Sequence, residues 1–405
     1  MTMTDQTVRA WNILGEDLAP SQAAPAPDQR WDFDGGFALV YLANSRFGLA
    51  KPVIFADGFN SGPSNPDAMW EHLERREYAM ATALRERGSD LIMLGYTERS
   101  AAIQDNANVA IACISRAIAD RRGNEPLVAG GFSMGGLVTR YALAKMEQRR
   151  QDHQTAVYFS WDSPHRGAWI PISLQAMAHY LKDQDGVTEM SDYINSPAAR
   201  ELLRWHIDTV TADTDPDPLR AVFLEELERY GSWPQRPLKL GLANGSGQGN
   251  GLQINAGAEM LKATGLLHPY RTTTLYAQAR GDDKLVAHLK RQRITNPPPA
   301  VERHTSGLPE ADAAPGGTLR SFGIARDNLA ALGAVECPHE WVSFVPTVSA
   351  VAIRDIDQQQ DLYANVATLP PDESDLDEFK CASDNQEHSL VTPELADWLL
   401  ARLPK

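Results

Sequence analysis

The sequence predicts an α/β protein built on a mainly parallel, doubly wound sheet. Two observations support this fold class. From position 52 onward, short apolar runs alternate with amphipathic stretches of about 15 residues, which is the pattern of βαβ units. The chain has 405 residues, of which 43% are hydrophobic and 22% are charged, so it can bury a sizeable core. Right-handed crossovers between parallel strands then place helices on both faces of the sheet.

The first half of the chain shows the clearest alternation of strands and helices. Residues 15–30, rich in Ala, Pro, Asp and Gln, form a predicted linker. In the stretch 69–87, Trp70, Leu73 and Leu84 recur at helical spacing, so we expect one helix there. The predicted strands of this half are 37–43, 52–56, 90–96, 126–130 and 155–161, and the predicted helices are 69–87, 106–121 and 134–148.

Helical patterns replace the strand signal between 167 and 236, which predicts a helical, lid-like insertion. Two strand-like stretches then flank the turn Arg280-Gly-Asp-Asp283 and predict a β-hairpin insertion. The predicted helices of the insertion are 174–181, 197–208 and 218–230. They are followed by a strand at 238–243, hairpin strands at 272–279 and 285–293, an irregular loop at 297–317, a strand region at 341–353 and a terminal helix at 393–403.

These elements divide the chain into five predicted segments along one core. Both halves of the core are interrupted by insertions, because the strand pattern stops and resumes twice. The segments are 1–45 (N-terminal segment and first strand), 46–166 (first half of the core), 167–236 (helical insertion), 237–330 (core strand with hairpin and loop insertion) and 331–405 (second half of the core).

Composition excludes several classes of function. With 38 Lys and Arg against 53 Asp and Glu, the formal net charge of −15 disfavours nucleic acid and anionic membranes as partners. Cys113, Cys337 and Cys381 are too few for a disulfide framework or a cysteine zinc site. We find no metal-binding spacing, P-loop or dinucleotide fingerprint, and expect no metal or cofactor.

Residues 1–6 lack a secretory pattern and no apolar run reaches 18 residues, so we expect a cytoplasmic protein without an integral membrane segment. The oligomeric state stays open.

The most informative motif is Gly131-Phe-Ser133-Met-Gly135, which matches G-x-S-x-G. It lies between an apolar strand and a helix, as this nucleophile turn requires. The glycines let neighbouring backbone pass close to a strained serine. The turn therefore predicts that Ser133 is a nucleophile exposed at the end of a strand.

A serine nucleophile needs a base, and the expected order along the chain is serine, acid, histidine. His388 lies 255 residues after Ser133, in a loop just before the terminal helix. His165 is the alternative, but the sequence Ser163-Pro-His165-Arg-Gly167 follows a predicted strand and is typical of a structural turn. We therefore expect His388 to be the base.

Several segments together resemble lipase-like α/β hydrolases, a family that includes bacterial lipase-type enzymes and relatives of the GPI inositol deacylases. The resemblance spans most of the chain from about residue 50 to 403 and implies an α/β-hydrolase fold and ester hydrolysis. The segments that carry it are Pro52-Val-Ile-Phe-Ala-Asp-Gly-Phe59, Gly131-Phe-Ser-Met-Gly-Gly-Leu-Val-Thr-Arg-Tyr141, Asp162-Ser-Pro-His-Arg-Gly-Ala168, Ala243-Asn-Gly-Ser-Gly247, Phe344-Val-Pro-Thr-Val-Ser-Ala350 and Glu387-His388 with Thr392-Pro393.

The acid of the triad departs from the family pattern. Many of these lipases carry it in D-G-x-V-P, but Val342 stands at the matching position. Asp162 ends the strand after the elbow helix, where pancreatic-type lipases carry their acid. We therefore expect an Asp162 carboxylate oxygen roughly 2.6–3.2 Å from a His388 ring nitrogen. The alternatives left open are Glu340, Asp355, Asp357, Asp282 and Asp283.

The fold would supply an oxyanion hole from two backbone N–H groups, those of Phe59 and Met134. Gly58 would let the chain turn toward the substrate carbonyl. The apolar acyl pocket is expected to include Phe132, Trp161 and Trp169, together with the side chains of Phe59 and Met134.

The sequence thus predicts a serine hydrolase that cleaves a small-molecule carboxylic ester or thioester through an acyl-enzyme. The same triad would serve a thioesterase, cyclase or acyltransferase when another acceptor replaces water. A hydrolase-fold binding protein with an inactive site is the non-enzymatic alternative. The natural acyl and alcohol groups are not specified by these motifs.

Overall fold

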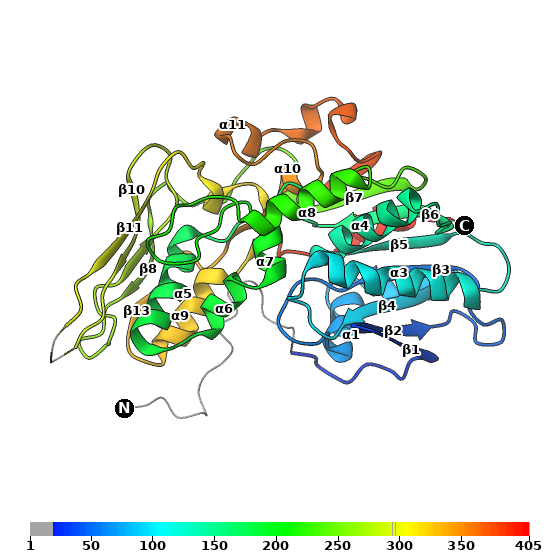
Figure 1. Cartoon of the computed structure of the whole chain (residues 1–405), viewed down its shortest axis with the longest axis horizontal. Helices are drawn as coiled ribbons and strands as arrows, with labels where there is room; N and C mark the ends of the chain where they lie inside the picture. Colours follow the sequence, from blue (N-terminus) through cyan, green and yellow to red (C-terminus); the bar gives the residue numbers. More distant parts are fainter. Residues whose placement is uncertain (1–18, 294, 296, 405) are drawn as a thin grey trace.

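The computed structural model describes residues 19–404 apart from 294 and 296. Its main sheet has eight strands in the order β1-β2-β4-β3-β5-β6-β7-β15 (Figure 1). The pairs β1–β2 and β2–β4 are antiparallel and every other pair is parallel. The strands are β1 Gln29–Phe33, β2 Gly36–Tyr41, β3 Pro52–Ala56, β4 Asp90–Tyr96, β5 Leu127–Phe132, β6 Thr155–Trp161, β7 Leu238–Ser246 and β15 Glu378–Ala382.

Helices cover both faces of this sheet because successive side chains of a strand point to opposite sides. In β3, Ile54 lies in one apolar cluster with α3 (Ile103–Asp120) and α4 (Met134–Gln148). Its neighbour Phe55 lies in a second cluster with three other helices, α1 (Pro66–Glu74), α2 (Met80–Glu86) and α12 (Pro393–Leu400). The sheet is therefore doubly wound, as the sequence predicts.

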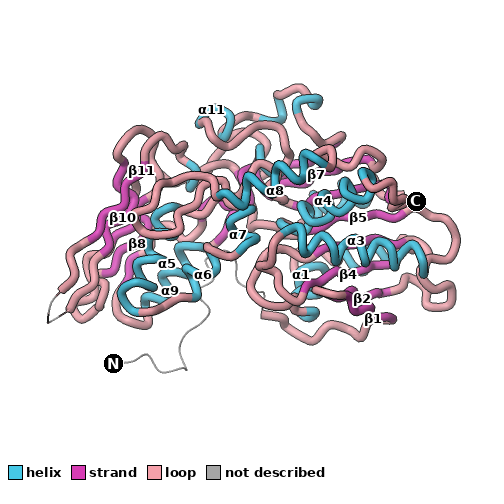
Figure 2. Tube along the Cα trace, viewed as in Figure 1, coloured by secondary structure: helices cyan, strands magenta, loops and turns pink. Residues whose placement is uncertain are grey.

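Parts of the chain between β6 and β14 form a second lobe (Figure 2). Between β6 and β7 the chain forms only helices, and a five-stranded antiparallel sheet in the order β11-β10-β9-β8-β13 packs against two helices of this lobe, α5 and α9. The elements of this lobe are α5 Ile172–Asp185, α6 Glu189–Ile194, β8 Glu259–Ala263, β9 Thr274–Tyr276, β10 Lys284–Leu289, β11 Val301–Thr305, α9 Ser321–Ala330 and β13 Val335–Glu336. The two other helices of the stretch between β6 and β7, α7 Pro197–Leu202 and α8 Pro218–Arg229, pack instead against α3 and α4 of the main sheet.

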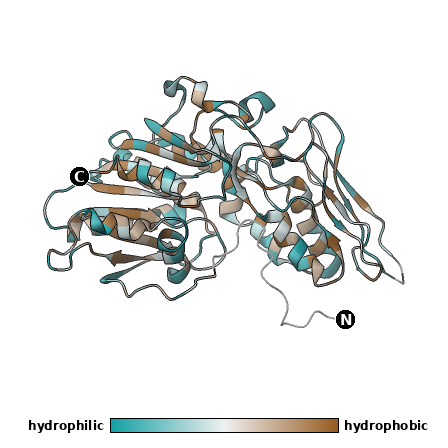
Figure 3. Ribbon diagram, turned by 180° about the vertical axis from the view of Figure 1, so that it is seen from behind, coloured by the Kyte–Doolittle hydropathy of each residue, from teal (hydrophilic) through white to brown (hydrophobic). Residues whose placement is uncertain are grey.

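The two lobes are joined by a small antiparallel pair, β12 (Gly316–Leu319) with β14 (Val342–Pro346). Short helices follow at α10 (Thr347–Ala350) and α11 (Gln359–Leu362). Apolar residues concentrate in the strands of the main sheet, whereas the helices present polar residues outward (Figure 3). None of the helices in the described part of the chain combines the length and apolarity that a membrane crossing needs.

Several predicted elements are confirmed to the residue, among them the strands at 52–56, 90–96 and 155–161 and the helix at 134–148. The single helix predicted over 69–87 is wrong. The chain forms two helices there, α1 and α2, since the backbone leaves the helical conformation at Arg75 (φ −117°, ψ 8°). The Arg75 side chain donates from this point to the backbone carbonyls of Gln22 and Ala23.

Four other predictions need correction or completion. The stretch 297–317 is not an irregular loop, because it contains β11, which pairs with β10, and the start of β12. The predicted hairpin exists, but as part of the larger sheet. The strand region 341–353 ends at Pro346 and pairs outside the main sheet, whose last strand is the unpredicted β15. The predicted linker 15–30 begins outside the described residues, and β1 starts within its end.

Candidate active site

Ser133 occupies a sharp turn between β5 and α4. Its backbone has φ 51° and ψ −122°, a conformation that is unfavourable for a non-glycine residue. A hydrogen bond of 2.8 Å from the Ser133 amide to the Trp161 carbonyl holds the turn. A side chain at Gly131 or Gly135 would place its Cβ only 2.6 or 2.3 Å from the carbonyl oxygen of Ala56. Glycine is therefore required on both sides, and the strained turn presents Ser133 at the end of the sheet.

The structure brings Asp162 and His388 together. Asp162 directly follows β6, and its Oδ2 accepts a hydrogen bond from His388 Nδ1 over 2.6 Å, within the expected range. The carboxylate is completely buried, and Oδ1 accepts from the Asn244 amide at 3.0 Å. The Ser389 amide lies 3.4 Å from Oδ2. These donors fix the carboxylate, which in turn orients the imidazole so that Nε2 lies on the side of the ring away from Asp162.

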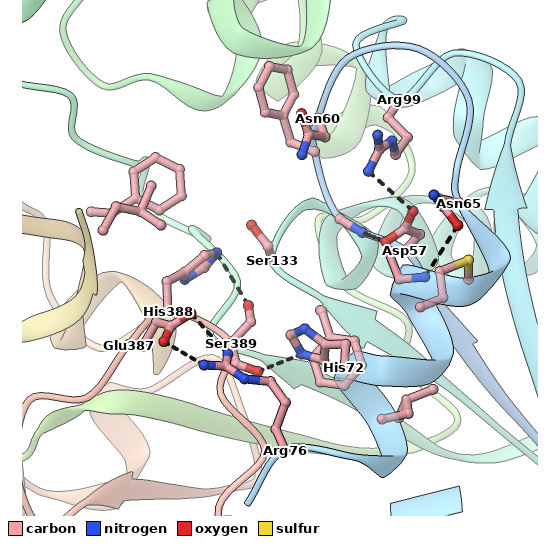
Figure 4. A pocket seen from close by; sticks show the side chains of 18 of the residues that line it. Asp57, Asn60, Asn65, His72, Arg76, Arg99, Ser133, Glu387, His388 and Ser389 are labelled. Atoms are coloured by element: carbon pink, nitrogen blue, oxygen red, sulfur yellow. Dashed lines mark hydrogen bonds and ion pairs between the residues drawn. The ribbon is translucent and has the colours of Figure 1, made fainter. Parts of the chain in front are cut away.

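His388 and Ser133 line the same pocket, with Ser133 lying between His388 and the loop that carries Asp57 and Asn60 (Figure 4). The Nε2 atom of His388 is 3.3 Å from the hydroxyl of Ser389. Phe344 packs edge-on against the imidazole, with the ring centroids 4.8 Å apart. Two hydroxyl groups, those of Ser133 and Ser389, therefore lie on the Nε2 side of the ring.

The loop after β3 passes directly beside Ser133. A Cβ at Gly58 would lie 3.4 Å from Cβ of Ser133, which is ordinary van der Waals contact. Phe59 lines the pocket, and Met134 is the first residue of α4, where backbone N–H groups have no partner within the helix. Arg99 supports the loop by donating to the Ser61 carbonyl at 2.8 Å. Both expected oxyanion donors thus belong to segments that flank Ser133.

The pocket has a volume of about 370 Å³ and opens at the carboxyl ends of the parallel strands, where ligands bind in open α/β sheets. Apolar side chains form most of its wall and charged groups lie near His388. The apolar lining includes Phe55, Phe59, Met69, Leu73, Phe132, Leu319, Ile324, Trp341 and Phe344, and the polar lining includes Asp57, Asn60, Asn65, His72, Arg76, Arg99, Arg320 and Glu387.

Two tryptophans expected in this pocket lie elsewhere. Trp161 is fully buried and donates from Nε1 to Asn244 Oδ1 at 3.1 Å. Trp169 is 1% exposed and donates to Asp312 over 2.6 Å. The side chain of Met134 also points into the core, whereas Gly58, Phe59 and Phe132 do line the pocket. The aromatic rings flanking Asp162 are therefore structural, because buried indole N–H groups need partners and find them in the core.

The alternative base and acids have other partners. His165 is buried against Trp233, with Nε2 2.9 Å from Ser160 Oγ, and burial lowers its pKa well below the usual value. Glu340 pairs with Arg320 and Arg326. Asp355 Oδ1 lies 3.9 Å from Arg166 Nε, and Asp357 pairs with Arg204. Asp282 and Asp283 are exposed at a turn, where Asp283 contacts His304.

Several residues of the site carried no recognisable signal in the sequence. Gly317 lies so close to Asp162 that a Cβ there would be 1.8 Å from Oδ2. His72 reaches the pocket from the last turn of α1 and Arg76 from the bend just after it, although their positions predict only an amphipathic helix. Asn244 was part of a family-like segment, yet its contact with the acid depends on the pairing of β7 with β6.

Among residues 19–404, leaving out 294 and 296, no cluster of three or more His, Cys, Asp or Glu side chains is arranged to hold a metal ion.

No family model and no curated protein matches the sequence. Solved structures similar to the chain include the mature form of BlEst2, a lipase from Bacillus licheniformis. It aligns at 17% sequence identity over 49% of this chain and 66% of its own, with a TM-score of 0.31. Est1E from Butyrivibrio proteoclasticus aligns at 14% identity over 53% of this chain and 76% of its own, with a TM-score of 0.31. An esterase/lipase from an uncultured bacterium aligns at 11% identity over 54% of this chain and 75% of its own, with a TM-score of 0.31. The alignment thus covers about half of this chain and just under two thirds of BlEst2. The order of the strands, the helices on both faces and the Ser133 turn give the chain the α/β-hydrolase fold.

Proposed function

We propose that the protein is a serine hydrolase that cleaves a small-molecule carboxylic ester or thioester through an acyl-enzyme. The observation that carries this proposal is the 2.6 Å contact between the buried Asp162 carboxylate and His388 Nδ1, with Nε2 directed to the pocket that Ser133 lines. A buried carboxylate, an oriented imidazole and a serine on a strained turn are the parts that nucleophilic acyl transfer needs.

In the proposed mechanism, His388 Nε2 takes the proton of Ser133 Oγ while that oxygen attacks the substrate carbonyl carbon. The tetrahedral oxyanion accepts hydrogen bonds from the N–H groups of Met134 and Phe59. Asp162 holds the tautomer with the proton on Nδ1 and stabilises the imidazolium. His388 then gives its proton to the leaving alcohol or thiol, and a water molecule activated by the same Nε2 releases the acid. Contacts between nucleophile and base often tighten only once substrate is bound.

The pocket supports a substrate of moderate size. Its volume of about 370 Å³ lies at the small end of ligand sites in proteins. The rings of Phe59, Phe132 and Phe344 favour an apolar acyl group next to Ser133. We therefore expect esters of short or medium acyl chains to be better substrates than long-chain esters. Product analysis with an added alcohol would separate hydrolysis from acyl transfer.

Labelling with a fluorophosphonate tests the proposal, because only an activated serine reacts quickly. The wild-type protein should label at Ser133, and Ser133→Ala should lose labelling and about 10⁶-fold in kcat. Ser389→Ala is the matched control, since it removes the other hydroxyl near Nε2. Peptide mapping that places the label on Ser389 would reverse the assignment. A folded wild-type protein that does not label would favour the inactive binding protein instead.

A further inference from the structure

The loop that carries His388 has an unfavourable backbone that needs external support. Ser389 has φ 61°, in the left-handed region that non-glycine residues seldom adopt. On one side, β12 holds the loop through hydrogen bonds from the Thr318 amide to the Gln386 carbonyl at 2.9 Å and from the His388 amide to the Thr318 carbonyl at 2.8 Å. The other side of the loop faces α1.

His72, in the last turn of α1, contacts the residue after His388. Its Nε2 donates to the Ser389 carbonyl oxygen over 2.8 Å, and its ring packs 4.5 Å from that of Phe132. Burial lowers the pKa of His72 to about 4, so the ring is neutral near pH 7 and carries one N–H. Because a carbonyl can only accept, that N–H must be on Nε2.

Arg76 contacts the residue before His388. Its Nη1 and Nη2 donate to the two carboxylate oxygens of Glu387 at 2.9 and 2.7 Å, which is a bidentate pair (Figure 4). The two side chains are 24% and 31% exposed, so the pair is partly shielded from water. A bidentate pair restricts orientation more than a single contact does.

We propose that His72, in the last turn of α1, and Arg76, just after the end of that helix, are positioning residues that hold His388 by its two neighbours. This inference rests on the proposed function, because it assigns the pair to the orientation of the base. His72 holds the backbone carbonyl of Ser389, the residue after His388, and Arg76 holds the side chain of Glu387, the residue before it. Since both also line the pocket, a competing role for Arg76 is to bind an anionic group of the substrate.

The kinetics of five variants distinguish these roles, measured with a p-nitrophenyl butyrate substrate and with the rate of fluorophosphonate labelling. His72→Phe keeps a ring but removes the donor, and should lower kcat by about 10- to 100-fold with KM little changed. His72→Gln keeps a donor and should recover part of that loss. Arg76→Ala and Glu387→Ala should each lower kcat about tenfold, and the double variant should lose no more than either single one.

Arg402→Ala is the matched control. Arg402 pairs with Glu378 at 2.6 Å with 31% and 44% exposure, remote from the pocket lining. It should change neither kcat nor the labelling rate. Folding of each variant is checked by its thermal midpoint, and Arg76→Ala keeps the proposal testable if His72→Phe does not fold.

Three results would overturn the proposal that His72 and Arg76 position His388. Folded His72→Phe and Arg76→Ala proteins with wild-type kcat would show that these two side chains do not position the base. A rise in KM alone for Arg76→Ala would assign Arg76 to substrate binding. If the wild-type protein neither labels nor hydrolyses esters, the proposed function fails, but amide hydrogen exchange still tests whether His72 and Arg76 hold the loop. Exchange at 386–390 should accelerate in His72→Phe and in Arg76→Ala. Unchanged exchange in both variants would refute the positioning role.

Discussion

Gly317→Ala tests whether the Asp162–His388 contact is required. The added methyl group would lie 1.8 Å from Asp162 Oδ2 and 2.8 Å from its Cγ, whereas Cβ atoms essentially never come closer than 3.0 Å to another atom. The carboxylate would therefore have to retreat by more than 1 Å. It cannot do so freely, because the Asn244 amide binds Oδ1 at 3.0 Å and the Asp162 amide binds the Leu242 carbonyl at 2.7 Å.

The expected loss in kcat is about 10²- to 10⁴-fold. The lower value corresponds to a misplacement of about 1 Å, and the upper value to loss of the acid's function in a triad. Overpacking should also lower the free energy of unfolding by about 1–3 kcal/mol. The assay is the initial rate of p-nitrophenyl butyrate hydrolysis under saturating substrate, with urea unfolding measured on the same samples.

Gly316→Ala is the matched control in the same strand. Its methyl group would meet the Val345 carbonyl oxygen at 2.5 Å and Ser343 Oγ at 2.6 Å, so this site is also too crowded for a Cβ, but none of its three nearest atoms belongs to Asp162. We expect a similar loss of stability with kcat largely retained. If folded Gly317→Ala hydrolyses the ester within threefold of Gly316→Ala, the argument from the Asp162–His388 geometry is refuted.

Three further predictions follow from the same contacts. Asp162→Asn should lower kcat by about 10⁴-fold because the amide favours the wrong tautomer of His388, and steady-state rates that stay within tenfold of wild type would contradict this. His165→Ala should lower the free energy of unfolding by about 1–3 kcal/mol, through loss of its contacts with Ser160 and Trp233, and leave kcat within threefold; loss of Ser133 labelling in that variant would make His165 the base. Glu201, in α7, accepts from the Ile103 amide at 2.7 Å, and burial raises its pKa to about 7. The folded state therefore holds this proton more tightly than the unfolded state, so its contribution to stability is present below pH 4.5 and is lost as the pH rises toward 7. Glu201→Gln should remove that loss, and urea unfolding at pH 5 and pH 8 should show the variant gaining on wild type at pH 8; an equal difference at both values would contradict the assignment.

Much of the main sheet could be predicted because its strands are short apolar runs between amphipathic helices. The strand at 90–96 and the helix at 134–148 match the structure at both ends. β15 was not predicted because its five residues, Glu-Phe-Lys-Cys-Ala, are not a continuous apolar run: two of them are charged, only one is fully buried, and the segment becomes a strand by pairing with β7. The same reason applies to β11, which forms by pairing with β10.

The site was predictable where function imposes a local pattern. The Ser133 turn needs glycines on both sides, and that requirement is written in five consecutive residues. Asp162 was the expected acid because strands that follow one another in a parallel sheet end at one edge, and the structure places it 2.6 Å from His388. Trp161 and Trp169 were misplaced because position beside Asp162 in the chain does not specify which way a ring points.

The sequence by itself determined the fold class, the strained serine turn and the order of the candidate triad, because each depends on interactions within a few residues or on the direction of a parallel sheet. Only the tertiary structure decided what surrounds His388. His72 contacts Ser389 across 317 positions of the chain, and Gly317 makes room for Asp162 from a strand outside the main sheet. Such contacts join segments whose local patterns predict only a helix or a turn, so they exist once the core has packed these segments against one another.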